Sequence, residues 1–354
     1  MQRLQDTIGG IQAPDAAVAA AARERLRQQA RPAGSLGLLE DVAVRLAGIF
    51  GTLDVRLKEK VVVTCAGDHG VCAEGVSLFP QEVTPQMVYN FLNGGASVNV
   101  LARHAGARVM VADLGVAADF DPGLPMFHKK VGRGTANFAL GPAMPRDQAL
   151  RSIAAGIEIV AELASQKALH LLGTGDMGIG NTSPSTAIIA VFSGRPVAEV
   201  VDRGTGVDDQ GLRRKIAAIE KGLAVNRPDP ADPLGVLAKV GGFEIGGIAG
   251  LIIGAAAHRV PVVCDGFIST AGALIACALA PAAREYLFAS HLSVEAGHGA
   301  MLAHLGLVPL FDLKFRLGEG TGAALAMELI DAATRVLADI RTFEEVAIAD
   351  AQKG

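Results

Sequence analysis

The chain has 354 residues and a formal net charge of −4, and 50% of its residues are hydrophobic against 19% charged. This balance argues against disorder and leaves enough apolar surface for a large buried core. Aromatic residues make up only 4%, without any Trp, so neither a basic surface nor base-stacking aromatics favour nucleic-acid binding.

The four cysteines, Cys65, Cys72, Cys264 and Cys277, have spacings that match neither a zinc ribbon nor a redox pair. Cys65 and Cys264 lie in apolar, strand-like runs. We therefore expect buried free thiols.

The N-terminus has no signal-peptide h-region. The most apolar stretches, residues 246–257 and 267–283, are too short or too interrupted to span a bilayer. We therefore expect a cytoplasmic protein with no membrane and no nucleic-acid partner.

The first part of the chain is predicted to form two helices, over residues 14–29 and 38–49. The run 31–37, Arg-Pro-Ala-Gly-Ser-Leu-Gly, separates them because Pro and Gly interrupt a helix. Residues 60–66 then form a continuous β-branched run, typical of a strand buried on both faces. Residues 108–113 repeat this pattern.

A glycine-rich run over residues 173–180 follows a third predicted strand at 168–172. Ser183-Pro184 then predicts an N-cap and a first-turn proline, so a helix would begin directly after the glycines. A helix N-terminus behind a glycine loop binds phosphate, because free N–H groups and the helix dipole point at it. The glycine spacing fits neither a Walker A nor a dinucleotide motif, so the pattern predicts only an anion or nucleotide phosphate.

Further strands are predicted at residues 260–264 and 286–290, and helices at 147–164, 210–224 and 323–341. Thr84-Pro85 and Asp232-Pro233 predict two more helix starts. Buried strands that alternate with helices favour an α/β fold, with a mostly parallel sheet covered on both faces.

The run 316–322, Arg-Leu-Gly-Glu-Gly-Thr-Gly, places one carboxylate between glycines just before a strongly helical segment. Clustered glycines indicate unusual backbone dihedrals or close approach of a ligand. Thr321 is a plausible N-cap, which would leave Glu319 on a tight turn at the mouth of a cleft. A loop with a solvated Glu is the plainer interpretation of this run alone.

Two further polar groups follow predicted strands. Asp68 and His69 come after the first strand, where ligands bind in open α/β sheets, although a structural Asp that caps a turn is favoured for Asp68 alone. His291 and His298 lie seven residues apart, a spacing that fits no standard metal site. We therefore expect no metal.

Along nearly its whole length the chain resembles the nicotinate-nucleotide:dimethylbenzimidazole phosphoribosyltransferases, which activate the lower ligand of cobamides. The motifs that carry this resemblance are residues 31–37, 68–71 with 74–76, 175–182, 239–243, 265–267 and 316–320. They are long and stand in the family's order.

The resemblance implies a Rossmann-like catalytic domain over residues 51–322, a small helical domain drawn from residues 1–50 and 323–354, and a homodimer. It implies a reaction without a cofactor. A nitrogen of 5,6-dimethylbenzimidazole or a related base attacks C1′ of nicotinate mononucleotide, nicotinate leaves, and α-ribazole 5′-phosphate forms with inversion for assembly of the cobalamin nucleotide loop.

The resemblance makes Glu319 the general base. As the ring nitrogen bonds to C1′, the proton on the other nitrogen becomes acidic, and a nearby carboxylate that accepts it contributes ~10²–10⁴-fold. Nicotinate is already a pyridinium cation in the substrate, so it leaves without a proton donor. Asp176 is our candidate for a second carboxylate, which would ease positive charge on the ribose.

The resemblance also implies two subsites. The phosphate and ribose would contact Gly175, Gly178, Asn181, Thr182, Lys215, Ser293 and Arg316. The base pocket would contain Val76, Phe79, Met87 and Leu317.

Two positions depart from the family pattern. Asp176 stands where the family often has Glu, and Phe79 and Met87 align with positions that are polar in some members. An apolar slot fits a flat aromatic base but leaves benzimidazoles, adenine and phenolic bases open.

Two other functions compete with phosphoribosyl transfer. A non-catalytic nucleotide-binding regulatory module would use the same glycine loop but would not need Glu319. A metal-assisted hydrolase would use Asp68, His69 and Asp265, and a chelator would abolish its activity.

Overall fold

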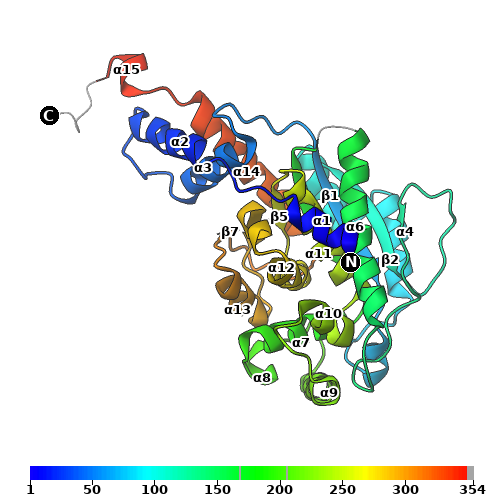
Figure 1. Cartoon of the computed structure of the whole chain (residues 1–354). Coiled ribbons are helices and arrows are strands. Elements are labelled where there is room, and N and C mark those ends of the chain that lie inside the picture. Colours follow the sequence, from blue (N-terminus) through cyan, green and yellow to red (C-terminus); the bar gives the residue numbers. More distant parts are fainter. Residues whose placement is uncertain (167–168, 205, 349–354) are drawn as a thin grey trace.

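The fold is built on one seven-stranded sheet with the order β3-β2-β1-β4-β5-β6-β7 (Figure 1). It was obtained as a computed structural model that describes residues 1–166, 169–204 and 206–348. The strands are β1 (Lys60–Gly67), β2 (Arg108–Gly115), β3 (Phe127–His128), β4 (Leu171–Met177), β5 (Val262–Cys264), β6 (Leu287–His291) and β7 (Pro309–Phe311). All neighbouring strands pair in parallel, which confirms the predicted α/β class and gives the doubly wound strand order.

Helices cover both faces of the sheet. One face carries α6 (Arg146–Gln166), α10 (Pro233–Val240), α11 (Phe243–Ala257) and α12 (Phe267–Leu279). The other carries α4 (Val83–Leu92), α5 (Ser97–His104) and the N-terminal part of α14 (Thr321–Asp339). Beyond the carboxyl ends of the strands lie α7 (Thr182–Ser193), α8 (Val197–Val200), α9 (Asp209–Asn226) and α13 (Ala296–Leu305). Two short 3₁₀ helices span Gly70–Glu74 and Pro281–Tyr286.

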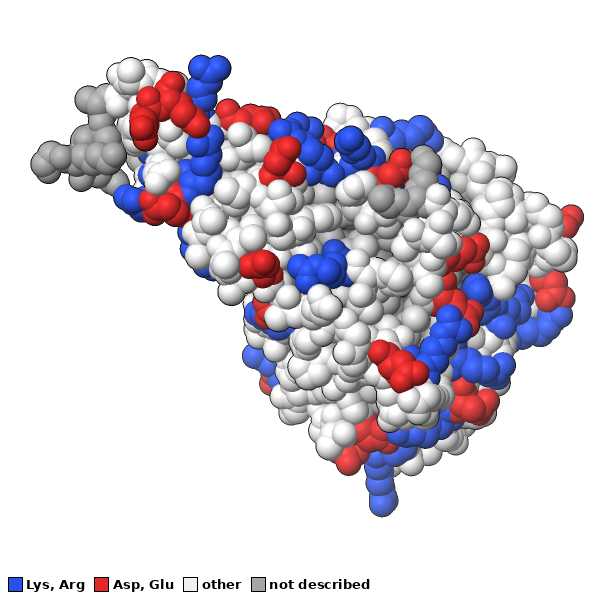
Figure 2. Space-filling model, turned by 45° about the horizontal axis from the view of Figure 1, so that its top comes forward, with Lys and Arg blue, Asp and Glu red and all other residues white. Residues whose placement is uncertain are grey.

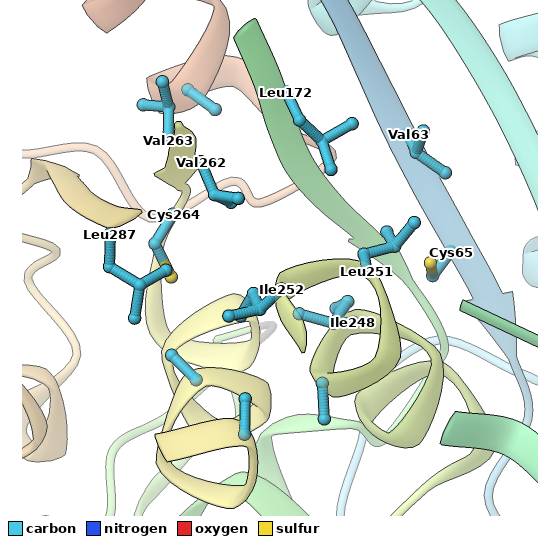
Figure 3. Close-up of a cluster of buried hydrophobic side chains, with 14 of the residues drawn as sticks. Val63, Cys65, Leu172, Ile248, Leu251, Ile252, Val262, Val263, Cys264 and Leu287 are labelled. Carbon is cyan, nitrogen blue, oxygen red and sulfur yellow. The ribbon is translucent and has the colours of Figure 1, made fainter. Parts of the chain in front are cut away.

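The core lies between α11 and the central strands. Figure 3 shows Ile248, Leu251 and Ile252 of α11 facing side chains of the strands, among them Val63 and Leu172. These side chains are fully buried, and each contributes about 1.5–3 kcal/mol relative to an exposed position. The predicted large core is confirmed, and so is the burial of the free thiols Cys65 and Cys264, whereas Cys72 and Cys277 are free but only partly buried.

The two ends of the chain lie side by side. The helices α2 (Ala16–Gln28) and α3 (Leu38–Phe50) pack against the C-terminal half of α14, beside α15 (Phe343–Val346) (Figure 1). Gln29 pairs with Thr342 through an isolated β-bridge, and Arg25 forms an ion pair with Glu345 at 2.8 Å. The helix α1 (Gln2–Gly9), which the sequence did not indicate, packs against α6 and α11 instead.

The glycine run after the third strand differs from its prediction. Residues 173–177 are the second half of β4 and not a loop, and Ala168, the first residue of the predicted strand, lies outside the described residues. The glycines serve packing: a Cβ at Gly175 would lie 2.2 Å from the carbonyl oxygen of Glu319, and one at Gly173 2.9 Å from Met327. The loop begins only at Gly178.

The predicted helix starts are accurate to one or two residues. Asp232 caps α10 as expected, because its carboxylate accepts a hydrogen bond from the backbone N–H of Gly235. The predicted caps Thr84, Ser183 and Thr321 are instead the first or second residues of their helices. The hydroxyl of Thr84 accepts from the backbone N–H of Ile179, a tertiary contact that local sequence does not encode.

The surface carries charges of both signs. Figure 2 shows acidic and basic side chains interspersed around one face, whose middle is mostly uncharged. Within the described part of the chain, no helix combines the length and hydrophobicity needed to cross a membrane.

Close packing of α6 against α11 gives the first prediction. A Cβ at Gly250 of α11 would lie 1.9 Å from the backbone oxygen of Ile153 in α6, whereas a Cβ at the exposed Gly299 of α13 would meet nothing within 4 Å. Gly250→Ala should therefore lower the free energy of unfolding by about 1–3 kcal/mol. Gly299→Ala should raise it by about 0.5–1 kcal/mol. Urea unfolding measures both, and a Gly250→Ala protein as stable as the parent would contradict the packing described.

Candidate active site

A cavity of about 330 Å³ opens at the carboxyl ends of β4, β5 and β6. Its walls come from the end of β4, the turn before α7, the N-terminus of α12, the segment after β6, helix α4 and the loop before α14. This is the edge where ligands bind in open α/β sheets, and the volume suits a nucleotide-sized ligand.

The loop before α14 has a strained backbone. Gly318, Glu319 and Gly320 are all left-handed, with φ of 82°, 66° and 100°. A non-glycine residue rarely adopts this conformation, which costs of order 1–3 kcal/mol and persists only where the surroundings impose it. The hydroxyl of Thr64 in β1 donates to the carbonyl oxygen of Glu319 at 2.8 Å and helps to impose it.

Asp265, directly after β5, holds the same loop from the other side. Its carboxylate accepts hydrogen bonds from the backbone N–H groups of Gly320 at 3.1 Å and Ala323 at 2.9 Å. These N–H groups belong to the start of α14 and have no partner within the helix. Burial raises the pKa of Asp265 to about 7, although the backbone N–H groups favour its charged form. Asp265 does not line the cavity, so its contacts are with the loop.

The side chain of Glu319 lines the cavity and is only 6% exposed. Its Oε2 accepts a hydrogen bond of 3.3 Å from the backbone N–H of Val98, in the first turn of α5. Burial raises the pKa of the Glu319 carboxyl, and this hydrogen bond opposes the rise. The solvated-loop interpretation of Glu319 is therefore wrong.

Asp176, near the end of β4, lines the same cavity. Its Oδ2 accepts from the side-chain amide of Asn181 at 2.9 Å, while Oδ1 has no hydrogen-bond partner among the described residues. Burial, followed by the nearby carboxyls of Asp265 and Glu244, raises the pKa of Asp176 well above its usual value. A Cβ at Gly318 would lie 3.1 Å from both Asp176 oxygens, so the two carboxylate-bearing segments are in direct contact.

Two cationic side chains, Lys215 and Arg316, lie in or beside the wall of the cavity. The buried Lys215 of α9 donates from Nζ to the hydroxyl of Thr182 and to the carbonyl oxygen of Asp202, both at 2.8 Å. Burial lowers the pKa of Lys215 to about 8. Arg316 lines the cavity and donates to the carbonyl oxygen of Gly204 at 3.5 Å. The first turn of α7, at Thr182, also faces this region, so the cavity has an anion-binding end.

Most of the residues predicted for the site line this one cavity. They are Phe79, Met87, Asp176, Gly178, Asn181, Thr182, Ser293, Arg316, Leu317 and Glu319.

Three predicted site residues do not line it. Gly175 lies within β4 against the loop of Glu319, and Lys215 lies behind Thr182. Val76 is buried beside Gly180, on the outer side of the turn before α7.

The cavity also contains residues that sequence reasoning did not assign to it. These are Val83, Met177, Ile179, Gly204, Gly266, Phe267, Ile268, His291, Glu295 and Gly318. Several of them stand at or within two residues of the end of a strand, which is the signal that identifies them in retrospect.

The residues of the metal-hydrolase alternative are engaged elsewhere. His69 forms a buried ion pair with Glu244 at 2.8 Å, and Asp68 accepts from the backbone N–H of Ala117 at 2.8 Å. No group of three potential metal ligands occurs among the described residues.

His291 and His298 are neutral. Burial lowers the pKa of His291 to about 4 and that of His298 to about 3. His298 accepts from the backbone N–H of Ser293 at 2.9 Å and its other ring nitrogen contacts the Thr270 hydroxyl at 2.9 Å, so it fixes the segment after β6.

Comparison with known proteins identifies the family. A family model described as phosphoribosyltransferase matches residues 11–348. The nicotinate-nucleotide–dimethylbenzimidazole phosphoribosyltransferase of Geobacter sp. (strain M21) is 57% identical over 98% of this chain and 99% of its own length. That of Roseiflexus castenholzii is 54% identical over the whole of both chains. The crystal structure of CobT from Thermus thermophilus is 47% identical, with a TM-score of 0.91 over 95% of this chain and 100% of that one. The chain therefore belongs to the nicotinate-nucleotide–dimethylbenzimidazole phosphoribosyltransferase family.

Proposed function

We propose that this enzyme transfers the phosphoribosyl group of nicotinate mononucleotide to 5,6-dimethylbenzimidazole or a related lower-ligand base, giving α-ribazole 5′-phosphate and nicotinate. The observation that carries the proposal is one cavity with the buried carboxyl of Glu319 in its wall and Arg316 and the first turn of α7 at its anion-binding end. The names of the relatives support the substrates, and favour transfer over a regulatory nucleotide-binding module.

Glu319 acts as the general base in this proposal. The base's ring nitrogen forms a bond to C1′ as the C1′–nitrogen bond to nicotinate breaks, and that electron pair neutralises the pyridinium. The proton on the second ring nitrogen passes to Glu319. The raised pKa of the Glu319 carboxyl brings its basicity closer to neutral pH, where proton acceptance is most efficient.

Asp176 acts as the second carboxylate. The free enzyme buries Asp176 beside other acids, which disfavours its charged form. Nicotinate mononucleotide carries a pyridinium cation, and the ribose gains positive charge as that bond breaks. A positive charge beside Asp176 offsets the electrostatic cost of its ionisation, so the carboxylate stabilises the transition state more strongly in this dry site than in water.

The substrate's phosphate binds in the anion-binding part of the cavity. There Arg316 supplies a charge-assisted hydrogen bond, Ser293 and the first turn of α7 supply neutral donors, and Lys215 adds positive charge from behind Thr182. Gly178, Asn181 and Thr182 lead into that turn. Gly175 contributes only by leaving room for the Glu319 loop.

The base lies in an apolar slot formed by Phe79, Met87 and Leu317, with Val83 and Met177 beside them. Val76 lies outside the cavity wall, beside Gly180, so its part in the base pocket is indirect. A flat aromatic ring fits such walls, and benzimidazoles, adenine and phenols all remain candidates.

Incubation with nicotinate mononucleotide and a panel of bases tests the function, with products identified by mass. We expect α-riboside phosphates from at least one benzimidazole. Glu319→Gln keeps the size of the side chain but cannot accept the proton, so kcat should fall about 10²–10⁴-fold. Glu220→Gln, an exposed position on α9, is the matched control. Full transfer by Glu319→Gln would overturn the role of Glu319, and absence of product with every base would overturn the function.

Asp265 should act as a positioning residue for Glu319. Asp265→Asn replaces one acceptor oxygen by an N–H group that faces the N–H groups of Gly320 and Ala323. We expect a loss of about 1–3 kcal/mol in the free energy of unfolding and a lower kcat, with the exposed Asp312→Asn as control. Urea unfolding and initial rates measure the two effects, and a variant unchanged in both would contradict this role.

The remaining parts of the proposal concern organisation and location. We propose that residues 1–50 and 323–354 form a small helical domain beside the catalytic domain of residues 51–322, supported by the packing of α2 and α3 on α14, although α1 and the N-terminal part of α14 pack on the catalytic domain. We propose a cytoplasmic location because all four cysteines are free, as is usual in reducing compartments.

We also propose that the enzyme is a homodimer. Val100 of α5 and Leu313 are more than half exposed, and a hollow lined by Leu101 and Phe315 joins their two segments. Such exposed apolar surface is typical of an interface.

Light scattering tests the dimer. The parent should have twice the chain mass of 36.3 kDa, and the double variant Val100→Lys, Leu313→Lys should shift towards the monomer because it buries two charges in the contact. Val225→Lys on α9 is the control. A monomeric parent would contradict the proposal, and a dimeric double variant would place the interface elsewhere.

A further inference from the structure

Glu295 lies between β6 and α13 and lines the anion-binding end of the cavity with Ser293 and Arg316. It is only 6% exposed, and its Oε2 has no hydrogen-bond partner among the described residues. Buried carboxyl oxygens are nearly always hydrogen-bonded, so an unpartnered one in the wall of a ligand cavity indicates a partner supplied by the ligand.

The charged groups around Glu295 come from three segments. Lys215 of α9 and Arg316 attract its carboxylate, and Asp202, after α8, repels it. Lys215 uses two of its three N–H groups on Thr182 and Asp202, and within the described residues no ion pair joins it to Glu295. His291 and His298 are neutral and add no charge. Glu295 therefore lies close to the two cations without neutralising either.

An acid at this place conflicts with binding of a phosphate. A phosphate monoester is mostly a dianion near pH 7, and an ionised carboxylate beside it in a site of low dielectric would repel it strongly. One proton between the two groups removes this repulsion and turns it into a charge-assisted hydrogen bond.

We propose that Glu295 and the 5′-phosphate of the substrate share one proton in the complex, with Oε2 and a phosphate oxygen as the two ends of one short hydrogen bond. The inference rests on the proposed function and makes Glu295 a substrate-binding residue for the phosphate. Burial and Asp202 already raise the pKa of the Glu295 carboxyl in the free enzyme, and the phosphate raises it further. Binding then takes up a proton, so affinity is highest below the free-enzyme pKa of Glu295 and falls as pH rises through its pKa in the complex.

Calorimetry of the complete protein with nicotinate mononucleotide tests the proposal at pH 7, in two buffers of different ionisation enthalpy. The wild-type protein should take up about one proton per ligand, because one site gains one proton. Glu295→Gln donates an N–H group without a titrating proton, so its uptake should fall towards zero. The same variant should raise KM by a larger factor than it lowers kcat, since the contact concerns binding of the phosphate and not the reacting atoms.

Two controls separate Glu295 from its neighbours. Asp202→Asn removes a negative charge near Lys215 but keeps a side-chain oxygen that can accept from the backbone N–H of Ala296. Because Glu295 is unchanged in this variant, the proton uptake should stay intact. The riboside of nicotinate, which has no phosphate, should bind without uptake.

Undiminished uptake by Glu295→Gln would assign the proton to a group other than Glu295 and overturn the proposal, as would an uptake of zero by the wild-type protein. These results are distinct from failure of the proposed function, which would show as absence of riboside phosphate with every base. Product formation without proton uptake would overturn the inference about Glu295 alone.

Discussion

The arrangement of the active site depends on the hydrogen bonds between the Asp265 carboxylate and the first turn of α14. Asp265 follows β5 directly, and its own backbone is tied to Thr174 of β4 and Ser290 of β6. The rigid centre of the sheet therefore fixes the start of α14, and through it the left-handed loop that carries Glu319. Glu319, the general base that we propose, thereby acquires the positional precision of a strand although it lies on a loop, and proton transfer requires such precision.

The buried carboxyl groups of the site have raised pKa values. Asp176, Asp265 and Glu319 all lie buried near the same edge of the sheet, and burial raises the pKa of each. Glu244 adds a further acid, paired with His69. Strongly perturbed carboxyls in one cleft are typical of functional sites. Together with Arg316 in the wall and Lys215 behind Thr182, the acids give the cavity charges of both signs, which suits a ligand with a cationic ring and an anionic phosphate.

The sequence predicted the long central strands and the parallel sheet because buried β-branched runs leave little choice of structure. It did not predict β3 and β7, which have two and three residues and no periodic signal. The prediction of a phosphate loop at residues 173–177 is wrong, since Gly175 leaves room for the loop before α14 and Gly173 leaves room for α14 itself, and local sequence does not contain these partners.

Site residues are likewise predictable from sequence only where local sequence marks them. Asp176 and Glu319 were identifiable because each stands beside glycines near a predicted turn. The sequence does not single out Glu295, because its relation to Lys215 exists only once the fold brings α9 and the segment after β6 together. Residues that act through tertiary neighbours carry no motif of their own.

The backbone at residue 319 has an evolutionary consequence. Residue 319 has a φ of 66° and stands between two left-handed glycines. Glycine would adopt this backbone conformation at a lower energy than glutamate does. Glycine there would also remove a buried acid that favours its neutral form. Substitutions that stabilise the fold therefore favour glycine over glutamate at residue 319. Selection for the reaction in which we propose that Glu319 acts opposes them. An inactive descendant of this enzyme would be recognisable by a glycine at this position within an otherwise intact loop.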